Sequence, residues 1–167
     1  RMNGLFVTDV EPDEEYRAGR DALEAGNYRT AVDHLKRIEY PEDGSFPLLE
    51  YYVALSHGLL GLSDFENAVR VAFEYNLEEP STEAVASLPP RLQLLVTIAA
   101  YLGGDDALAH AASQEYVAGT DLNTADPRAI AIRVHLLRET SAPDATRLER
   151  SARSARPDVD WDSLLES

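Results

Sequence analysis

The four histidines are the residues of this chain best suited to acid–base or metal chemistry near neutral pH. They are His34, His57, His110 and His135. No two of them are three or four positions apart, so no helical turn presents a pair of imidazoles to a metal ion. Each of them lies inside a segment that is expected to be helical. The spacing therefore predicts packed or surface histidines and no metal site.

Other motifs that carry chemistry give no candidate. Gly103-Gly104 is not followed by Lys and Ser or Thr, so it does not form a phosphate loop, and no Gly-x-Ser-x-Gly elbow occurs. Acidic pairs such as Glu14-Glu15 are frequent, but among 30 acidic residues they do not single out a glycosidase-like site. The absence of cysteine excludes disulfides and thiolate catalysis. We predict no catalytic residues and no cofactor.

The charge of the chain limits its partners. A formal net charge of −15 repels nucleic acid and anionic membranes, so no nucleic-acid partner is expected. The longest apolar stretch, residues 92–102, is far shorter than the roughly 20 residues of a membrane span. Residues 1–4 show no signal-peptide pattern. These observations predict a cytoplasmic protein without a membrane span.

The basic residues are nearly all arginine, since Lys36 is the only lysine. This usage is typical of a GC-rich genome. Together with the many carboxylates it fits either a halophile, in which dense negative charge keeps a protein hydrated, or a merely acidic bacterial protein. The sequence leaves both interpretations open.

Apolar spacing and turn residues predict helices along the whole chain. Pro12 and three following acidic residues suit a first helical turn, and Gly26-Asn27 ends a helix over residues 12–25. The next helix is expected over 28–39, before a break at 40–44. The pattern then recurs, with helices over 47–59 and 65–79. These residues predict two consecutive helical hairpins.

The two hairpins share a motif at their turns. Residues 25–31 read Ala-Gly-Asn-Tyr-Arg-Thr-Ala, and residues 62–68 read Leu-Ser-Asp-Phe-Glu-Asn-Ala. A small or turn-forming residue and Asn or Asp precede an aromatic residue, and an alanine follows three positions later. The aromatic side chain is expected to fill the gap between the two helices, and the alanine to let their backbones approach.

This pattern resembles the tetratricopeptide repeat, a family of hairpins of about 34 residues, over residues 12–80. Pro80 stands where the closing proline of the family is expected, and in the first unit that proline is displaced to Pro41. The sequence departs from the family in its spacing of 37 residues from Tyr28 to Phe65. It also has Glu15 where a large residue is expected, and Ser56 where Gly19 of the first unit supplies the family's glycine.

Beyond Pro80, turn residues alone predict further helices over 81–88, 91–102, 107–117, 127–139 and 144–156. The resemblance implies an all-α fold of antiparallel hairpins, stacked as a short right-handed superhelix of about seven to nine helices. We expect an N-terminal extended segment at 1–11, a helical-repeat domain at 12–157 and an acidic tail at 158–167. The repeat units are 12–41, 47–80, 91–118 and 127–156.

The resemblance also implies a ligand groove, lined by the first helix of each hairpin. In register, the groove residues are Tyr16, Arg17, Arg20, Glu24, Glu50, Val53, Ala54 and His57. Family members that clamp a peptide carboxylate use a Lys/Asn/Arg set, to which only Arg17 and Arg20 correspond, so no such clamp is expected. An alternative is that the groove packs against the N-terminal segment or the tail of the chain itself.

The last predicted helix carries arginines at intervals of three, which keeps their charges near one face. They are Arg147, Arg150, Arg153 and Arg156. This basic face fits an acidic partner, a phosphate backbone or the acidic N-terminal half of the chain, which has 18 acidic and 7 basic residues in 1–90. The alternative is a solvated face with weak ion pairs.

We therefore predict a non-enzymatic scaffold that binds a protein or peptide segment in a groove of stacked hairpins. One alternative is a regulatory or sensory domain of a larger protein. A second alternative is a small α-helical enzyme. The sequence does not identify the partner or the oligomeric state.

Overall fold

The computed structural model describes residues 11–166, and the expected all-α fold is confirmed there. The expected extended segment at 1–11 lies outside these residues apart from Glu11. The described chain contains nine α-helices and two 3-10 helices and no strand. They are α1 (Pro12–Glu24), α2 (Tyr28–Lys36), η1 (Pro41–Asp43), α3 (Leu48–Gly61), α4 (Phe65–Glu74), η2 (Ala84–Ser87), α5 (Pro90–Leu102), α6 (Asp106–Ala118), α7 (Pro127–Thr140), α8 (Ala142–Ala155) and α9 (Trp161–Leu165).

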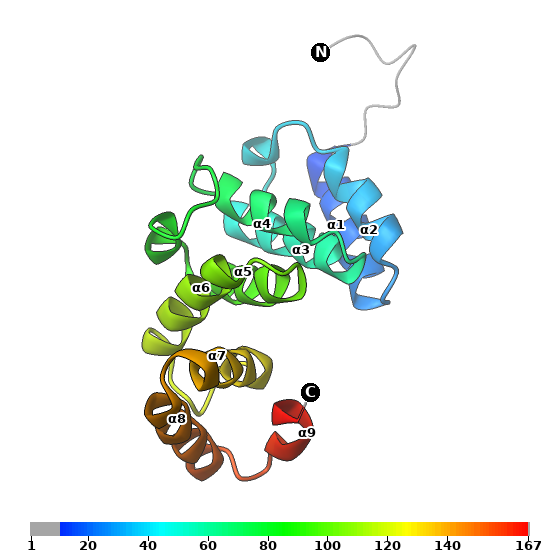
Figure 1. The fold of residues 1–167 in the computed structure, drawn as a ribbon. Coiled ribbons are helices and arrows are strands. Elements are labelled where there is room, and N and C mark those ends of the chain that lie inside the picture. The colour runs from blue at the N-terminus through cyan, green and yellow to red at the C-terminus, as the bar shows by residue number, and fades with distance from the viewer. Residues whose placement is uncertain (1–10, 167) are drawn as a thin grey trace, which may run out of the picture.

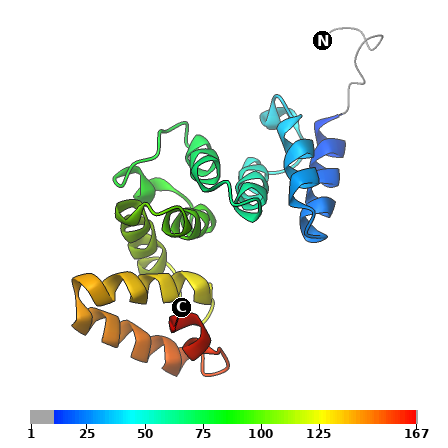
Figure 2. The same ribbon diagram turned by 45° about the vertical axis from the view of Figure 1, so that its right-hand side comes forward.

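The helices pack as four consecutive antiparallel hairpins, α1–α2, α3–α4, α5–α6 and α7–α8. Neighbouring hairpins touch through α2 and α3, α4 and α5, and α6 and α7. Figure 2 shows that the hairpins are turned relative to one another, since α3, α4 and α5 are seen nearly end-on while α7 and α8 lie across the view. The stack therefore bends, and the first hairpin and α9 both lie to the right in Figure 1.

Three of the hairpins share the same turn between their helices. Two residues after the first helix ends, φ is positive: 79° at Gly26, 60° at Ser63 and 84° at Gly104. The next residue donates its N–H to the carbonyl five positions back, which is the hydrogen bond of a Schellman turn. Equivalent positions are thus 37 residues apart between the first two hairpins, and 41 between the next two.

Small residues at equivalent positions let the two helices of a hairpin approach closely. The second helices each bury an alanine completely or almost completely: Ala31, Ala68 and Ala109. On the first helices, a Cβ added at Gly19 would lie 2.7 Å from Leu35 Cγ and 3.4 Å from the carbonyl oxygen of Ala31. Ser56, at the equivalent position, is buried and donates a hydrogen bond of 2.9 Å to the carbonyl of Ala68. Serine therefore joins the helices where the first unit has glycine.

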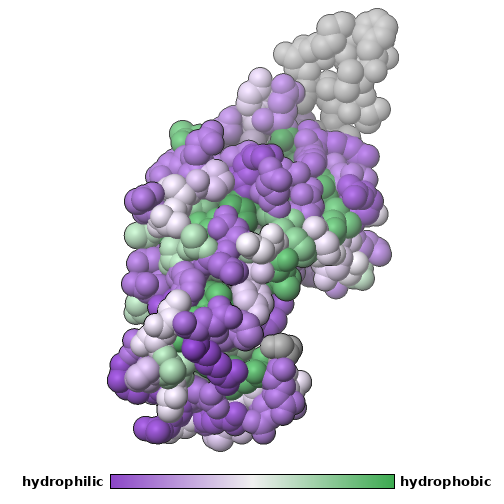
Figure 3. All heavy atoms as spheres, viewed as in Figure 1, coloured by the Kyte–Doolittle hydropathy of each residue, from purple (hydrophilic) through white to green (hydrophobic). Residues whose placement is uncertain are grey.

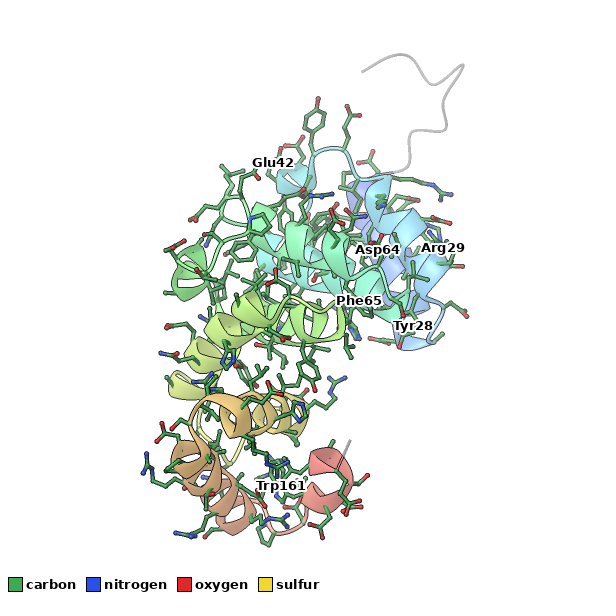
Figure 4. All side chains as sticks on the ribbon, viewed as in Figure 1. Tyr28, Arg29, Glu42, Asp64, Phe65 and Trp161 are labelled. Atoms are coloured by element: carbon green, nitrogen blue, oxygen red, sulfur yellow. The ribbon has the colours of Figure 1, made fainter. Side chains whose placement is uncertain are left out.

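The aromatic residue after each of the first two turns packs against the next hairpin. A Cβ added at Gly61 would lie 2.4 to 2.7 Å from three ring atoms of Tyr28, so this ring lies directly on the last turn of α3. In the same way, Phe65 contacts Gly103 at the end of α5, where an added Cβ would lie 3.1 Å from the Cβ of Phe65. Figure 4 shows the two aromatic residues labelled close to each other on the same side of the stack.

Some helix ends differ from the sequence prediction. The helix expected over 65–79 ends at Glu74, because Leu77 takes a positive φ of 57° and Glu78 N–H bonds back to the carbonyl of Phe73 at 3.2 Å. The helix expected over 28–39 ends at Lys36, and the segment 81–88 contains only the short 3-10 helix η2.

The hydrophobic core consists of two clusters. The larger cluster spans α2 to α6 and includes Ile132 and Leu136 of α7. The smaller cluster joins α7 and α8 to α9, where Trp161 is 3% exposed and Leu165 is buried. The Trp161 indole N–H donates to the carbonyl of Arg156 at 2.9 Å. The segment expected as an acidic tail therefore includes a short helix that packs on α7.

Candidate binding face

The first helices of the hairpins form one continuous side of the molecule. Contacts join α1 to α3, α3 to α5, and α5 to α7. The groove predicted from the resemblance lies along the first two of these helices. We call the side formed by α1, α3, α5 and α7 the first-helix face.

The N-terminal half of this face carries a connected polar network. Arg20 Nη1 donates to the Tyr16 hydroxyl at 3.0 Å and lies 3.5 Å from Glu50 Oε1. Arg91 of α5 forms two hydrogen bonds with the same carboxylate, one of them 3.2 Å from Nη2 to Oε1. The hydrogen bond from Arg91 is the main cause of a lowered pKa of Glu50, and the charges of Arg91 and Arg20 add to it, while partial burial opposes it.

An aromatic stack covers this network on one side. The ring of Phe46, in the connection before α3, lies parallel to that of Tyr16 with centroids 4.2 Å apart. The groove residues Tyr16, Arg20 and Glu50 are therefore brought together, but they bind one another and Arg91. Ligand binding at this end would have to replace existing ion pairs.

The other predicted groove residues are placed differently. Arg17 and Glu24 are exposed on α1, with Glu24 3.9 Å from Arg20, and Val53 is half-buried on α3. Ala54 is 2% exposed and belongs to the larger core cluster, so it is not available to a ligand as expected. It is buried because its side of α3 faces the core of the stack.

His57 is the predicted groove residue with the most distinctive surroundings. Its imidazole is exposed and lies 6.2 Å from the Tyr28 ring, measured between centroids. Partial desolvation lowers the pKa of His57 below its ordinary value of 6.5, and the positive charges of Arg128 and Arg20 lower it further. Side chains of α1, α2, α3 and α7 thus converge here.

A hollow of about 240 Å³ lies on the C-terminal half of the first-helix face. Its lining comes from α5, α7 and α9: Ile98, Tyr101, Leu102, Arg128, Ala131, Ile132, His135 and Leu164. Leu102 is 56% exposed, although it is a large apolar residue. The ring of His135 meets Tyr101 edge-on with centroids 5.7 Å apart, and Arg128 is held by Asp126 at 2.9 Å. We call this the C-terminal hollow.

Sequence reasoning missed the residues from α5 onward. The spacing of the turns could have identified them. The second and third turns are 41 residues apart, so Glu50, Val53 and His57 of α3 are equivalent to Arg91, Leu94 and Ile98 of α5. No such signal exists for α7, since its hairpin lacks the shared turn and Ser141 has a φ of −156° there.

The predicted basic face of α8 is largely occupied by contacts within the chain. Arg147 pairs with Asp144, and Arg153 pairs with Glu149 at 3.0 Å and with Asp162 of α9 at 2.7 Å. Arg156 donates to the carbonyls of Leu122 and Ala125 in the connection between α6 and α7. Arg150 is exposed and has no hydrogen-bond or ion-pair partner within residues 11–166. Arg153 and Arg156 therefore join α8 to its neighbours, while Arg147 pairs within α8.

The remaining histidines lie on different helices. His34 is 3.4 Å from Glu15, and His110 is 3.3 Å from Arg133. Within the described part of the chain, no group of three or more His, Asp or Glu side chains is arranged to hold a metal ion. The described helices are also too short or too polar to cross a membrane.

Comparison of the chain with family models, with curated proteins and with solved structures gives no match. The functional assignment therefore depends on the residues and their geometry.

Proposed function

We propose that this chain is a helical-hairpin module that binds a peptide or helical segment of a partner protein on its first-helix face. The observation that carries the proposal is the C-terminal hollow, where Leu102 is 56% exposed beside the half-buried Tyr101, above the buried side chains of Ile98, Ala131 and Ile132. An apolar side chain of the partner would bury surface there, at about 25 cal/mol per Å².

The two halves of the face have different roles in this proposal. The polar network around Glu50 is satisfied internally and stabilises the stack of α1, α3 and α5. Covering the C-terminal hollow with a partner would be favourable in free energy, because apolar surface there is in contact with water. A partner would therefore bind toward α7 and α9, further along the stack than the two N-terminal hairpins suggested.

The proposal can be tested by selecting binders from a random peptide library displayed on phage, with the immobilised chain as bait. We expect the selected peptides to share an apolar anchor and to lose about five-fold or more in affinity for Leu102→Gln, because that change removes an exposed apolar contact. Leu102 ends α5 and makes few buried contacts, so the variant should fold.

Leu77→Asn is the matched control, since Leu77 is also an exposed leucine but lies in the connection after α4. Peptides that bind both variants as tightly as the native chain would overturn the proposal. Peptides weakened only by Leu77→Asn would place binding elsewhere and would overturn it equally.

A further inference from the structure

A second and larger hollow lies between the second and third hairpins, away from the face described above. Its volume is about 600 Å³. It is formed by the start of α4, the connection at Glu79-Pro80 and the turn between α5 and α6. Figure 3 shows hydrophobic residues gathered over α4 and just below it, with hydrophilic residues around them. We call this the inter-hairpin hollow.

The wall of the inter-hairpin hollow is partly apolar. Its accessible apolar residues are Phe65, which is half-buried, and Pro80, which is exposed, while Val69, Ala99, Ala100 and Leu108 behind them are buried. This surface is not filled by the side chains of the chain itself, because the two hairpins meet here at their turns. The volume is sufficient for one or two amino-acid side chains of a partner.

The rim of the hollow is acidic. Asp64, Glu66, Glu79 and Asp105 lie around it, and Arg70 is the only basic residue in the lining. Arg70 is held by Glu66, with 3.0 Å between Nη2 and Oε1. The remaining three carboxylates have no cationic partner among the described residues, although Asp64 and Asp105 cap their helices by accepting from Asn67 and Leu108. The hollow therefore carries a net negative charge.

An exposed leucine stands on the same connection as Glu79. Leu77 is 93% exposed, two residues before that carboxylate, and its positive φ of 57° is uncommon for a leucine. The Glu78 N–H bond to the Phe73 carbonyl fixes the turn at this point. Leu77 is thus held in solvent on the segment that leads to Glu79 and Pro80, and it does not line the hollow.

We propose that the inter-hairpin hollow is a second docking site, for a partner segment in which a Lys or Arg side chain stands next to an apolar one. The apolar residue packs against Phe65 and Pro80, and the cation lies among Asp64, Glu79 and Asp105. Charge complementarity selects this occupant, since an acidic segment would face three uncompensated carboxylates. The site is separate from the first-helix face, so it does not depend on the function proposed above.

The experiment uses three capped peptides of the same length: Gly-Arg-Leu-Leu-Arg-Gly, its charge-reversed form with Glu for Arg, and a form with Ser for Leu. Each is titrated into the isotope-labelled chain, and amide shifts are followed by NMR. We expect the Arg-Leu peptide to shift amides of residues 63–70, 79 and 103–108. The other two peptides should leave these amides unchanged at the same concentration.

The decisive variant is the double substitution Asp64→Asn and Glu79→Gln. Asn caps a helix about as well as Asp and is the residue at position 27 of the first turn, so the fold is retained. We expect the dissociation constant of the Arg-Leu peptide to rise about five-fold, because two exposed charge contacts are removed. The control is Asp33→Asn with Glu39→Gln, two exposed residues elsewhere, which gives the same net charge.

Three results would overturn the proposal. One is the absence of shifts in these amides at millimolar peptide. Another is an equal loss of affinity in the control variant, which would show a general charge effect. The third is binding of the Arg-Leu peptide only at the C-terminal hollow, which would exclude the second site while leaving the first-helix face as the binding surface.

Discussion

Gly61 offers a direct test of how the hairpins are stacked. In Gly61→Ala the new methyl carbon would lie 2.4 to 2.7 Å from Cγ, Cδ1 and Cδ2 of Tyr28. Favourable carbon contacts are about 3.5–4.0 Å, so the ring must move by about 1 Å or the helices must separate. Overpacking of this kind costs about 1–3 kcal/mol. Alanine is favoured over glycine in a helix by up to about 1 kcal/mol, so the net destabilisation is about 0–2 kcal/mol.

The double-mutant cycle with Tyr28→Ala separates the two effects. Without the ring, the clash disappears and only the gain in helix propensity remains, so Gly61→Ala should stabilise the chain by up to about 1 kcal/mol. The coupling energy between the two positions is then about 1–3 kcal/mol. Gly103→Ala should show a smaller coupling with Phe65→Ala, because the Phe65 atom 3.1 Å from the added carbon is Cβ, which alanine retains, and Cγ of the ring is 3.7 Å away.

The four chains are compared by urea unfolding, followed by far-UV circular dichroism, with m-values checked for constancy. A coupling energy below about 0.5 kcal/mol would refute the reasoning, since the two positions would then act independently. It would mean that the aromatic residue at the turn does not set the distance between consecutive hairpins.

Three further predictions concern single residues. Leu77→Asn should raise the free energy of unfolding by about 0.5–1 kcal/mol and the melting temperature by about 2 °C. The reason is that asparagine tolerates a positive φ, while the leucine is 93% exposed and loses little packing. An unchanged or lower melting temperature would contradict this prediction. Glu15→Leu should leave the free energy of unfolding in urea unchanged or increase it. Glu15 is a buried charge, 5% exposed, and its ion pairs of 3.4 Å with His34 and 3.7 Å with Arg37 compensate poorly for its lost hydration. A loss above about 2 kcal/mol would contradict this prediction. His57 should titrate by NMR with a midpoint below 6.5. Because its pKa is lowered in the folded chain, the unfolded chain binds this proton better, so the contribution of His57 to stability is present above pH 6.5 and is lost as the pH falls through the folded pKa. His57→Gln should remove that pH dependence, and a midpoint at or above 6.5 would contradict the assignment.

Local chemistry explains which parts of the fold the sequence could predict. A Gly followed by Asn or Asp, with an Ala five positions after the Gly, favours a Schellman turn and a close helix pair, because all the hydrogen bonds of the turn are formed within ten residues. Turn residues alone predicted the third hairpin, in which the structure buries Ala109 as it does Ala31, although no aromatic residue follows its turn. The helix over 65–79 was predicted too long, because position 77 holds neither a Gly nor an Asn that would indicate the positive φ of Leu77.

Contacts between hairpins were less accessible to sequence reasoning. The sequence indicated that Tyr28 fills a gap within its own hairpin, whereas the structure places it on Gly61 of the next one. The hydrogen bond network of Glu50 likewise needed Arg91, which is 41 residues away. Such pairs depend on which positions of consecutive hairpins lie side by side. That correspondence can be derived only when the turns of the two hairpins are known to be equivalent.

The same register explains why the open apolar surface occurs where it does. Position 102 of the third hairpin is equivalent to Gly61 of the second. At Gly61 the absence of a side chain lets the Tyr28 ring of the preceding hairpin cover the end of α3. At position 102 there is a leucine, and Phe65 of the preceding hairpin packs on Gly103 instead. Leu102 therefore remains 56% exposed and lines the C-terminal hollow with residues of α7 and α9. Glycine at this position thus accompanies a stacking contact in the second hairpin, and leucine accompanies an open apolar surface in the third.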